Sequence, residues 1–293
     1  MFECVEAFHR PASVREALRL LRNGRGSARI IAGCTDVLAV TGDHADRSVR
    51  FLIDITGAGL SYVRRRGSAW AIGATSTMAE LEASAEVCGL AGGILARAAA
   101  ACGSIEIRNM ATVGGNMANG SPAADLAAPL LALDASAVVA NVRGRTKMPL
   151  AAYLASARTR EMGNSILVEV TFADPPCSKR SGWSFQKFGR TAVDISVVNV
   201  AAGLGLDARG RVQWARIALG SVAPLPMRAP DAEALMVGRS FDRALLTEVS
   251  AAVMRAVRPI GDIRASAEYR REISGVLTER ALVECASQAG LAI

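Results

Sequence analysis

Apolar residues recur at two different spacings in the first part of the chain. They follow a helical spacing after Ser13, which is a good N-cap because a glutamate stands three residues on, and Asn23-Gly24 ends that helix. Short apolar runs at 28–33 and 50–55 are typical of buried strands. The pattern therefore predicts a small α/β lobe that ends near residue 57.

The middle of the chain alternates between apolar and polar residues and then becomes helical. Alternation on both sides of 66–68 predicts a hairpin, and Thr77 is placed to cap a short helix. Ser121-Pro122 is a good cap followed by a first-turn proline. The remaining pattern predicts helices over 90–102 and 122–133 and strands at 137–142 and 166–172.

A second domain follows a linker at 173–178, which contains two prolines. Strands and then helices in sequence order are typical of an α+β domain, here with a three-stranded antiparallel sheet. The strand-like runs lie at 183–188, 197–206 and 212–219, and the pattern is helical from Asp231 on. We expect one domain over residues 1–175 and another over 179–293.

Composition and charge exclude several classes of protein. The chain is 51% hydrophobic and 21% charged, which is typical of a globular protein rather than a disordered one. Its net charge of +7 lies mostly in the second half and is mostly arginine. Arg64-Arg65-Arg66 is a basic run, and a solvated hairpin turn accounts for it better than a nucleic-acid interface, which would interleave basic and aromatic residues. We expect no nucleic acid as a partner, while an acidic protein remains an alternative.

The cysteines, the histidines and the N-terminal sequence indicate whether to expect a metal site and in which cellular compartment the protein is located. The 6 cysteines are scattered with no C-x-x-C pair, and with only 2 histidines no metal site can be assembled from local spacing. Free thiols fit a reducing compartment. We find no signal peptide and no uninterrupted apolar stretch of ~18 residues, so we expect a cytoplasmic protein without a membrane span.

Two glycine-centred stretches carry the candidate chemistry. Glycine lets backbone amides approach a phosphate, and a hydroxyl or amide side chain beside it adds a polar group. Neither stretch has the G-x-G-x-x-G or G-x-x-x-x-G-K-[ST] pattern. An ordinary strand-to-helix turn is the alternative for the first stretch, and a tight turn for the second. The first comprises Ile30, Ile31, Ala32, Gly33, Cys34, Thr35, Asp36 and Val37, and the second Thr112, Val113, Gly114, Gly115 and Asn116.

Two charged residues accompany these stretches. Asp125 is expected in the first turns of the helix over 122–133, where the helix dipole stabilises a carboxylate without any ligand. Lys187 lies on a predicted strand, and an exposed solvated charge is its alternative reading. Cys34 and Cys102 stand near the two stretches as reactive thiols or as small buried fillers.

Together these residues resemble the flavin-binding subunit of the molybdenum hydroxylase family, which includes xanthine dehydrogenase, carbon monoxide dehydrogenase and related aldehyde and N-heterocycle hydroxylases. The resemblance covers nearly the whole chain and is closest to the separate FAD subunit of bacterial xanthine dehydrogenases. It is carried by residues 8–13, 32–38, 107–116, 187–198, 220–224 and 266–271. The family usually has a second glycine where this chain has Cys34.

The resemblance implies a two-lobed FAD-binding domain followed by a small α+β domain that covers the flavin. Residues 30–37 would bind the FAD pyrophosphate, and residues 112–116 phosphate and ribityl. Asp125 would bind a flavin-side hydroxyl, Lys187 the far edge of the ring, and Leu167 would pack against the adenine or the ring. No residue of this chain is implied as a general acid or base.

The resemblance also implies a role in a complex. A large subunit with a molybdopterin cofactor would hydroxylate a purine or N-heterocycle, and a small subunit with 2Fe–2S clusters would pass electrons to the FAD of this chain and then to NAD⁺. One alternative is a carbon monoxide or aldehyde dehydrogenase-type complex with a quinone, cytochrome or oxygen acceptor. A weaker alternative is an assembly subunit without flavin.

Overall fold

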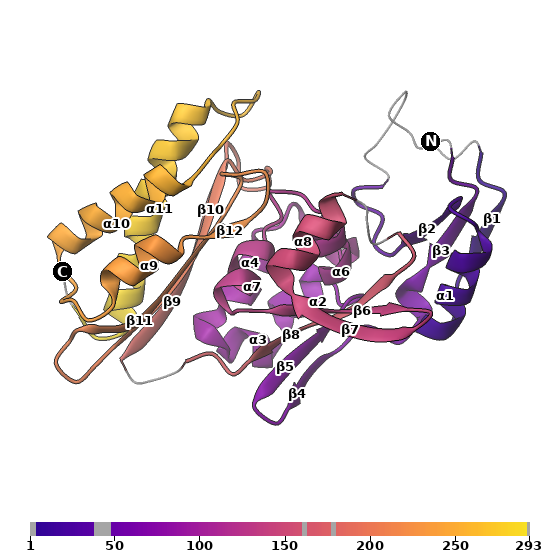
Figure 1. The fold of residues 1–293 in the computed structure, drawn as a ribbon, viewed down its shortest axis with the longest axis horizontal. Helices are drawn as coiled ribbons and strands as arrows, with labels where there is room; N and C mark the ends of the chain where they lie inside the picture. The colour runs from indigo at the N-terminus through magenta and orange to yellow at the C-terminus, as the bar shows by residue number, and fades with distance from the viewer. Residues whose placement is uncertain (1–3, 38–47, 160–162, 177–179, 292–293) are drawn as a thin grey trace. The chain divides into compact units, whose positions relative to one another are not determined.

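The computed structural model describes residues 4–37, 48–159, 163–176 and 180–291 (Figure 1). The contacts within the chain define two compact units. Unit 1 comprises residues 1–80, 104–120 and 136–171, and unit 2 comprises residues 81–103, 121–135 and 172–293. Each unit is therefore assembled from stretches that are far apart in the sequence.

Unit 1 begins with a parallel sheet of three strands. The strand order is β1 (Ala7–His9), β3 (Phe51–Asp54) and β2 (Ala28–Ile31). Helix α1 (Val14–Asn23) packs on β2 and β3, and Ser13 caps it by accepting a hydrogen bond from the Glu16 amide, as the sequence predicts. The strand β1 is not in the prediction because its three residues are too few to show a period.

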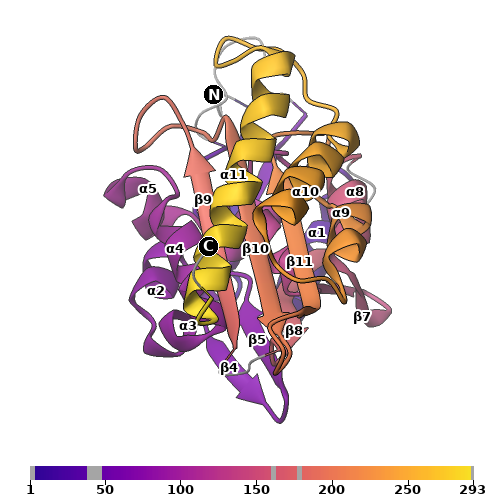
Figure 2. The same cartoon turned by 90° about the vertical axis from the view of Figure 1, so that its left-hand side faces the viewer.

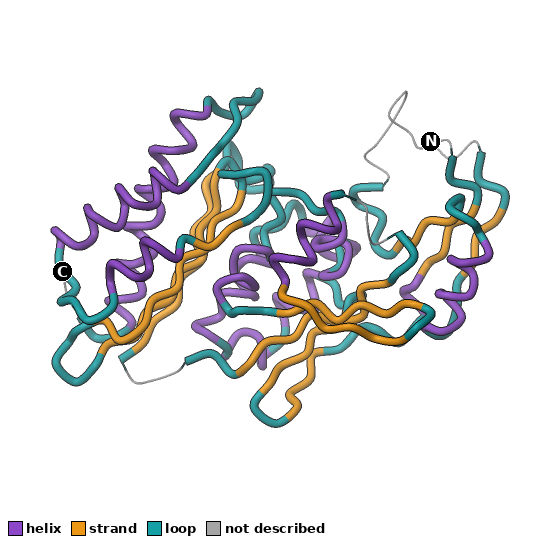
Figure 3. The backbone as a smooth tube through the Cα atoms, in the orientation of Figure 1, coloured by secondary structure: helices purple, strands orange, loops and turns teal. Residues whose placement is uncertain are grey.

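A five-stranded sheet forms the rest of the strand structure of unit 1 (Figure 3). The predicted hairpin and the two predicted later strands are all present in it. The strand order is β4 (Val63–Arg66), β5 (Ala69–Gly73), β8 (Ile166–Ala173), β6 (Ser136–Asn141) and β7 (Gly144–Pro149). The associated helices are the 3-10 turn η2 (Ile55–Gly57), α5 (Ile105–Met110), α6 (Val113–Ala118) and α8 (Leu150–Arg158), and α2 (Met78–Ala83) begins after Thr77.

Unit 2 is built around an antiparallel sheet. Its three long strands are the predicted ones, and a two-residue strand is added at one edge. The order is β12 (Met227–Arg228), β11 (Val212–Gly220), β10 (Val198–Leu206) and β9 (Ser181–Phe188). One face is covered by α9 (Pro230–Met236), α10 (Arg243–Ala256) and α11 (Ala267–Gln288), with α11 across β9 and β10 (Figure 2).

The other face of this sheet also carries helices. Helix α7 (Ala127–Ala132) packs against β10 and β11, and α4 (Ile94–Ala100) packs against β9. Every residue of β10 is buried as a result. A strand covered on both faces has a nearly continuous apolar sequence, and that of β10 is interrupted only by the buried Asn199.

Two predicted helices are wrong in their extent. The stretch 90–102 contains α4 only from Ile94, because Gly92 and Gly93 adopt positive φ in a short turn, η3 (Ala91–Gly93), that follows α3 (Ala85–Gly89). The helix expected from Pro122 begins at Ala127 instead. The Ser121 hydroxyl accepts from the Ala123 amide, so it closes a tight turn rather than capping a helix.

Two further expectations concern the linker and the membrane. Cys177 and Ser178 of the predicted linker lie outside the described residues. Within the described part of the chain, no helix combines the length and the apolar character that a bilayer span requires.

Candidate functional site

The two glycine-centred stretches lie against each other in unit 1. The first follows β2, and Gly33 contacts the C-terminal end of α5 with its backbone. A Cβ atom on Gly33 would lie 1.8 Å from the Met110 carbonyl oxygen and 3.1 Å from the Ala111 Cα. Only glycine permits this approach, so the first stretch is held directly beside the residues that lead into the second.

The backbone amides of the two stretches differ in their hydrogen bonding. No described residue accepts a hydrogen bond from the amides of residues 33–36. Residues 113–116 form the start of α6, and their four amides already donate, to Ser76 O, Ala74 O, Thr112 Oγ1 and Thr112 O. The amides of the first stretch are therefore donors that no described residue occupies and that suit an anion, while the amides of the second stretch are already hydrogen-bonded within the chain.

The glycines of the second stretch serve close packing. The sequence left a tight turn with positive φ open at Gly114-Gly115, but both residues are helical. A Cβ on Gly114 would lie 2.7 Å from the Ala74 oxygen, and the Gly114 amide donates to that oxygen at 2.7 Å. The left-handed residue near these stretches is Cys34, with φ of 59°. That conformation is the physical reason why a glycine suits this position.

The Cys34 side chain is a filler in an apolar cluster. It packs against a small cluster formed by Ile31, Val49 and Leu52. Burial raises the pKa of its thiol, and Asp54 raises it further, so the thiol stays protonated at neutral pH. The structure thus favours the filler interpretation over a reactive thiol.

Asp125 and Lys187 form a buried ion pair in unit 2. Lys187 Nζ donates to Asp125 Oδ2 at 2.9 Å and to the Ala101 carbonyl at 2.7 Å, and the two side chains are 9% and 8% exposed. Burial raises the pKa of Asp125 to about 6, and Lys187 opposes this rise. The exposed-charge reading of Lys187 is therefore wrong, and Asp125 lies in a turn before α7 rather than in a helix.

Two of the predicted site residues each have a buried oxygen without a hydrogen-bond partner among the described residues. Asp125 Oδ1 is buried and accepts no hydrogen bond from a described residue, and the same holds for Asn116 Oδ1 in unit 1. Buried acceptors without donors are rare in folded proteins and point to a missing ligand or water. A hydroxyl group is a donor that would satisfy either atom.

The remaining predicted residues lie on strands, at the start of α6 and in the turn after β2. Leu167 is a buried residue of β8, and its neighbours Ile166 and Val168 belong to the core beside α1, so alternation points Leu167 to the opposite face. Thr112 caps α6 through its hydroxyl. Ile30 and Ile31 lie on β2 and Val113 is buried in α6, while Ala32, Thr35, Asp36 and Val37 lie in the turn after β2.

Taken one unit at a time, the groups suit different parts of a dinucleotide, which has two phosphates and several hydroxyl groups. The amides of 33–36 suit a phosphate, and the orphaned oxygens suit hydroxyl donors. The groups that the sequence did not reveal are backbone carbonyls, above all those of Met110 and Ala101. The sequence does not show which backbone carbonyls contribute to a site, because every residue has one. A glycine that no turn requires can still indicate a close backbone contact.

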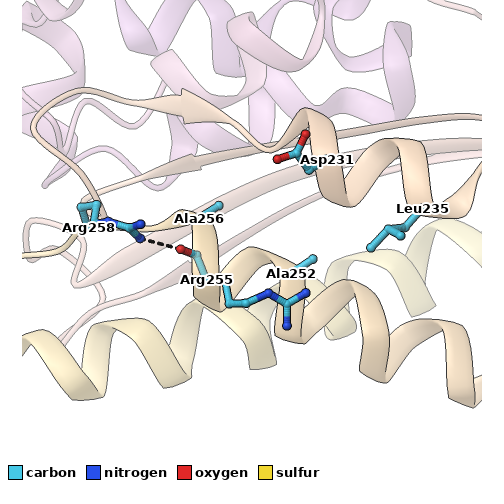
Figure 4. A pocket seen from close by; sticks show the side chains of 6 residues that line it. All are labelled: Asp231, Leu235, Ala252, Arg255, Ala256 and Arg258. Carbon is cyan, nitrogen blue, oxygen red and sulfur yellow. Dashed lines mark hydrogen bonds between the residues drawn. The ribbon is translucent and has the colours of Figure 1, made fainter.

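A separate pocket opens on the helical face of unit 2 (Figure 4). Its volume is about 440 Å³, and it lies on α9, α10 and the residues that follow α10. Arg258 folds back over the end of α10 and donates to the Arg255 and Val257 carbonyls. None of the residues predicted from the sequence lines this pocket, which comprises Asp231, Leu235, Ala252, Arg255, Ala256 and Arg258.

Comparison with known proteins accounts for nearly the whole chain. The family described as FAD binding domain in molybdopterin dehydrogenase matches residues 2–172, and the CO dehydrogenase flavoprotein C-terminal domain matches residues 183–285. The xanthine dehydrogenase FAD-binding subunit of Escherichia coli O157:H7 is 31% identical over 97% of this chain and 97% of its own. Subunit alpha of the 6-hydroxypseudooxynicotine dehydrogenase complex of Paenarthrobacter nicotinovorans is 30% identical over 94% and 93%.

A solved structure agrees with this assignment. Carbon monoxide dehydrogenase from Hydrogenophaga pseudoflava, in a form that lacks the Mo-pyranopterin moiety of its cofactor, superposes with a TM-score of 0.88 at 30% identity, over 97% of this chain and 98% of that chain. The predicted α+β architecture, an FAD-binding domain with a C-terminal domain, is thereby confirmed. The chain belongs to the FAD-binding medium subunits of the molybdenum hydroxylase family.

Proposed function

We propose that this chain passes electrons from 2Fe–2S clusters through its FAD to NAD⁺ in a xanthine dehydrogenase-type complex that hydroxylates a purine or N-heterocycle. The observation that carries this proposal is the 31% identity with a xanthine dehydrogenase FAD-binding subunit along 97% of both chains. The molybdenum cofactor would belong to a large subunit and the 2Fe–2S clusters to a small subunit. When bound, FAD supplies the redox chemistry between these donors and the acceptor.

The residues of this chain would bind and orient the cofactor. The amides of 33–36 would donate to the pyrophosphate, and Asn116 in the second stretch would meet the phosphate and ribityl portion. Asp125 Oδ1 would accept from a flavin-side hydroxyl, and Lys187 would bind the far edge of the ring. Leu167 would pack against the adenine or the ring.

The substrate would be chosen by another subunit. Relatives whose names specify 6-hydroxypseudooxynicotine, xanthine and carbon monoxide are 30%, 31% and 30% identical to this chain. Chains that serve such different substrates are equally similar to this one, which supports substrate binding elsewhere in the complex.

A second candidate keeps the FAD and changes the acceptor. The likeness to carbon monoxide dehydrogenase favours a complex that delivers electrons to a quinone, a cytochrome or oxygen. A flavin-free assembly subunit, the third candidate, has less support because the FAD-binding family covers residues 2–172.

One anaerobic titration separates these candidates. The purified chain is loaded with FAD and titrated with NADH while its visible spectrum is recorded, and photoreduction of a second sample shows that the bound flavin is reducible. Bleaching by NADH supports the NAD⁺-linked reading. A flavin that is photoreduced but not bleached by NADH refutes that reading and favours the second candidate. A chain that takes up no FAD refutes both.

A further inference from the structure

Ser221 has a backbone conformation that serine rarely adopts. It follows the last residue of β11, its φ is 65°, and the residue is 8% exposed. Residues other than glycine are disfavoured in this left-handed region. Such a conformation persists only where surrounding contacts hold it in place.

The contacts of Ser221 involve both sides of its backbone. Its amide donates to the Pro122 carbonyl at 2.7 Å, and its carbonyl accepts from the buried Arg270 at 3.2 Å. Its hydroxyl lies 2.8 Å from the Ser196 hydroxyl. The backbone dihedrals set the direction of the amide relative to the carbonyl, and at φ of 65° both groups reach their partners.

The Pro122 contact fixes the turn that carries Asp125. The turn is closed on itself, because the Ala124 amide donates to the Ser121 carbonyl and the Ala127 amide donates to the Ala124 carbonyl. A restraint on Pro122 is therefore transmitted to Asp125, three residues on. The amide of Ser221 is thus a direct backbone link between this turn and the sheet of unit 2.

The same sheet positions Lys187. In the strand register Lys187 of β9 is paired with Asn199 of β10, and Asn199 is paired with Gly220 of β11. Ser221 follows Gly220 directly, so it adjoins the row of residues that contains Lys187. The link through Ser221 therefore places the Asp125 turn at the level of Lys187 on the sheet.

We propose that Ser221 is a positioning residue of the cofactor site, whose left-handed conformation holds the Asp125 turn against the sheet so that the Asp125 carboxylate meets Lys187 and the cofactor. This inference rests on the proposed role of Asp125 toward FAD. It concerns a residue whose hydroxyl hydrogen-bonds to Ser196 rather than to either member of the ion pair.

Two substitutions separate the conformation of Ser221 from its hydroxyl. Ser221→Gly removes the hydroxyl and favours positive φ, whereas Ser221→Thr keeps the hydroxyl and disfavours positive φ because its Cβ is branched. We expect Ser221→Gly to bind FAD within about twofold of the wild type and Ser221→Thr to bind about tenfold more weakly, the latter a difference of ~1.4 kcal/mol. Should the threonine variant not fold, Ser221→Ala replaces it, because alanine also lacks the hydroxyl but does not favour positive φ; we then expect weaker binding than for Ser221→Gly.

The experiment is a double-mutant cycle on the full chain, with FAD dissociation constants measured by flavin fluorescence. We expect Asp125→Asn to weaken binding, and Ser221→Thr (or Ser221→Ala, if the threonine variant does not fold) to add nothing in the Asp125→Asn background, because both act through the same carboxylate. Additive losses, wild-type binding by the substituted chain, or equal losses in the glycine variant would overturn the inference and leave the role of Asp125 intact. Wild-type binding by Asp125→Asn would overturn the role of Asp125 itself.

Discussion

Replacing Gly33 by alanine tests whether the contact between the two glycine-centred stretches builds the cofactor site. The new methyl group would lie 1.8 Å from the Met110 carbonyl oxygen and 2.5 Å from its carbon. Since nonbonded carbon and oxygen atoms repel below about 3 Å, the two backbones must separate by about 1.2 Å. Both atoms belong to the backbone, so no side-chain rotation relieves the clash.

The expected losses can be estimated separately for stability and binding. Overpacking of this kind costs ~1–3 kcal/mol of folding free energy. A shift of about 1.2 Å also breaks at least one hydrogen bond from the 33–36 amides to a phosphate, and a hydrogen bond to a charged group is worth ~1.5–3 kcal/mol. We therefore expect FAD to bind about 10- to 100-fold more weakly.

The assay measures both quantities on the same protein. Urea unfolding without FAD gives the stability, and flavin fluorescence gives the dissociation constant. Gly89→Ala is the matched control, because that glycine ends α3 and a methyl group there would meet no other part of the described chain within 4 Å. The FAD affinity should therefore stay at the wild-type value, and the stability should stay the same or rise by up to ~1 kcal/mol, because alanine lowers the entropy of the unfolded chain. A Gly33→Ala chain that binds FAD as tightly as the wild type would refute the reasoning, even if its stability fell.

Three further changes have defined outcomes. Cys34→Gly should raise the stability by up to ~1 kcal/mol, because φ is 59° at this position and glycine adopts that conformation without strain. Cys34→Ala is the control, because it removes the thiol and keeps the strain. Equal stability of the two variants in urea unfolding would contradict this prediction. Burial raises the pKa of Asp125 to about 6, above its unfolded value of 3.8. Between these two pH values the folded chain therefore binds more protons than the unfolded chain, and the contribution of Asp125 to stability falls as pH rises through that window. Asp125→Asn should lack this component in urea titrations without FAD, and an unchanged pH profile would argue against the shift. Tyr62→Phe removes a 2.5 Å hydrogen bond to the buried Glu169 and should cost ~1.5–3 kcal/mol in urea without changing FAD affinity; a chain of wild-type stability would show that Arg66 alone satisfies that carboxylate.

Helix caps that depend only on residues close in the sequence were predicted correctly where no distant contact competed with them. Ser13 and Thr77 cap helices because each hydroxyl meets an amide three residues on, which any chain with that spacing can do. The same type of signal failed at Ser121, whose hydroxyl closes a turn two residues on. Serine before proline suits both structures, and packing in unit 2 decides between them.

Strands and contacts that depend on residues far apart in the sequence could not be predicted from it. The strand β7 has exposed polar residues along most of its length, so no alternation marks it, and it exists through its pairing with β6. In the site, the sequence named Lys187 and Asp125 but not their contact, which bridges 62 residues. It named Gly33 as a candidate phosphate-binding residue, with an ordinary turn as the alternative, but did not reveal that its neighbour in space is Met110.

The substitution of Cys34 for glycine shows which part of this site depends on side chains. Its amide has no acceptor among the described residues, and its side chain packs with Ile31, Val49 and Leu52. A residue at this position can therefore change its side chain without losing the donor, provided the backbone conformation is maintained. Gly33 and Gly114 differ from Cys34, because they matter through the absence of a side chain and cannot accept one without a backbone clash. A site made mostly of backbone groups depends on the course of the chain, and a relative with 30% identity retains that course with a TM-score of 0.88.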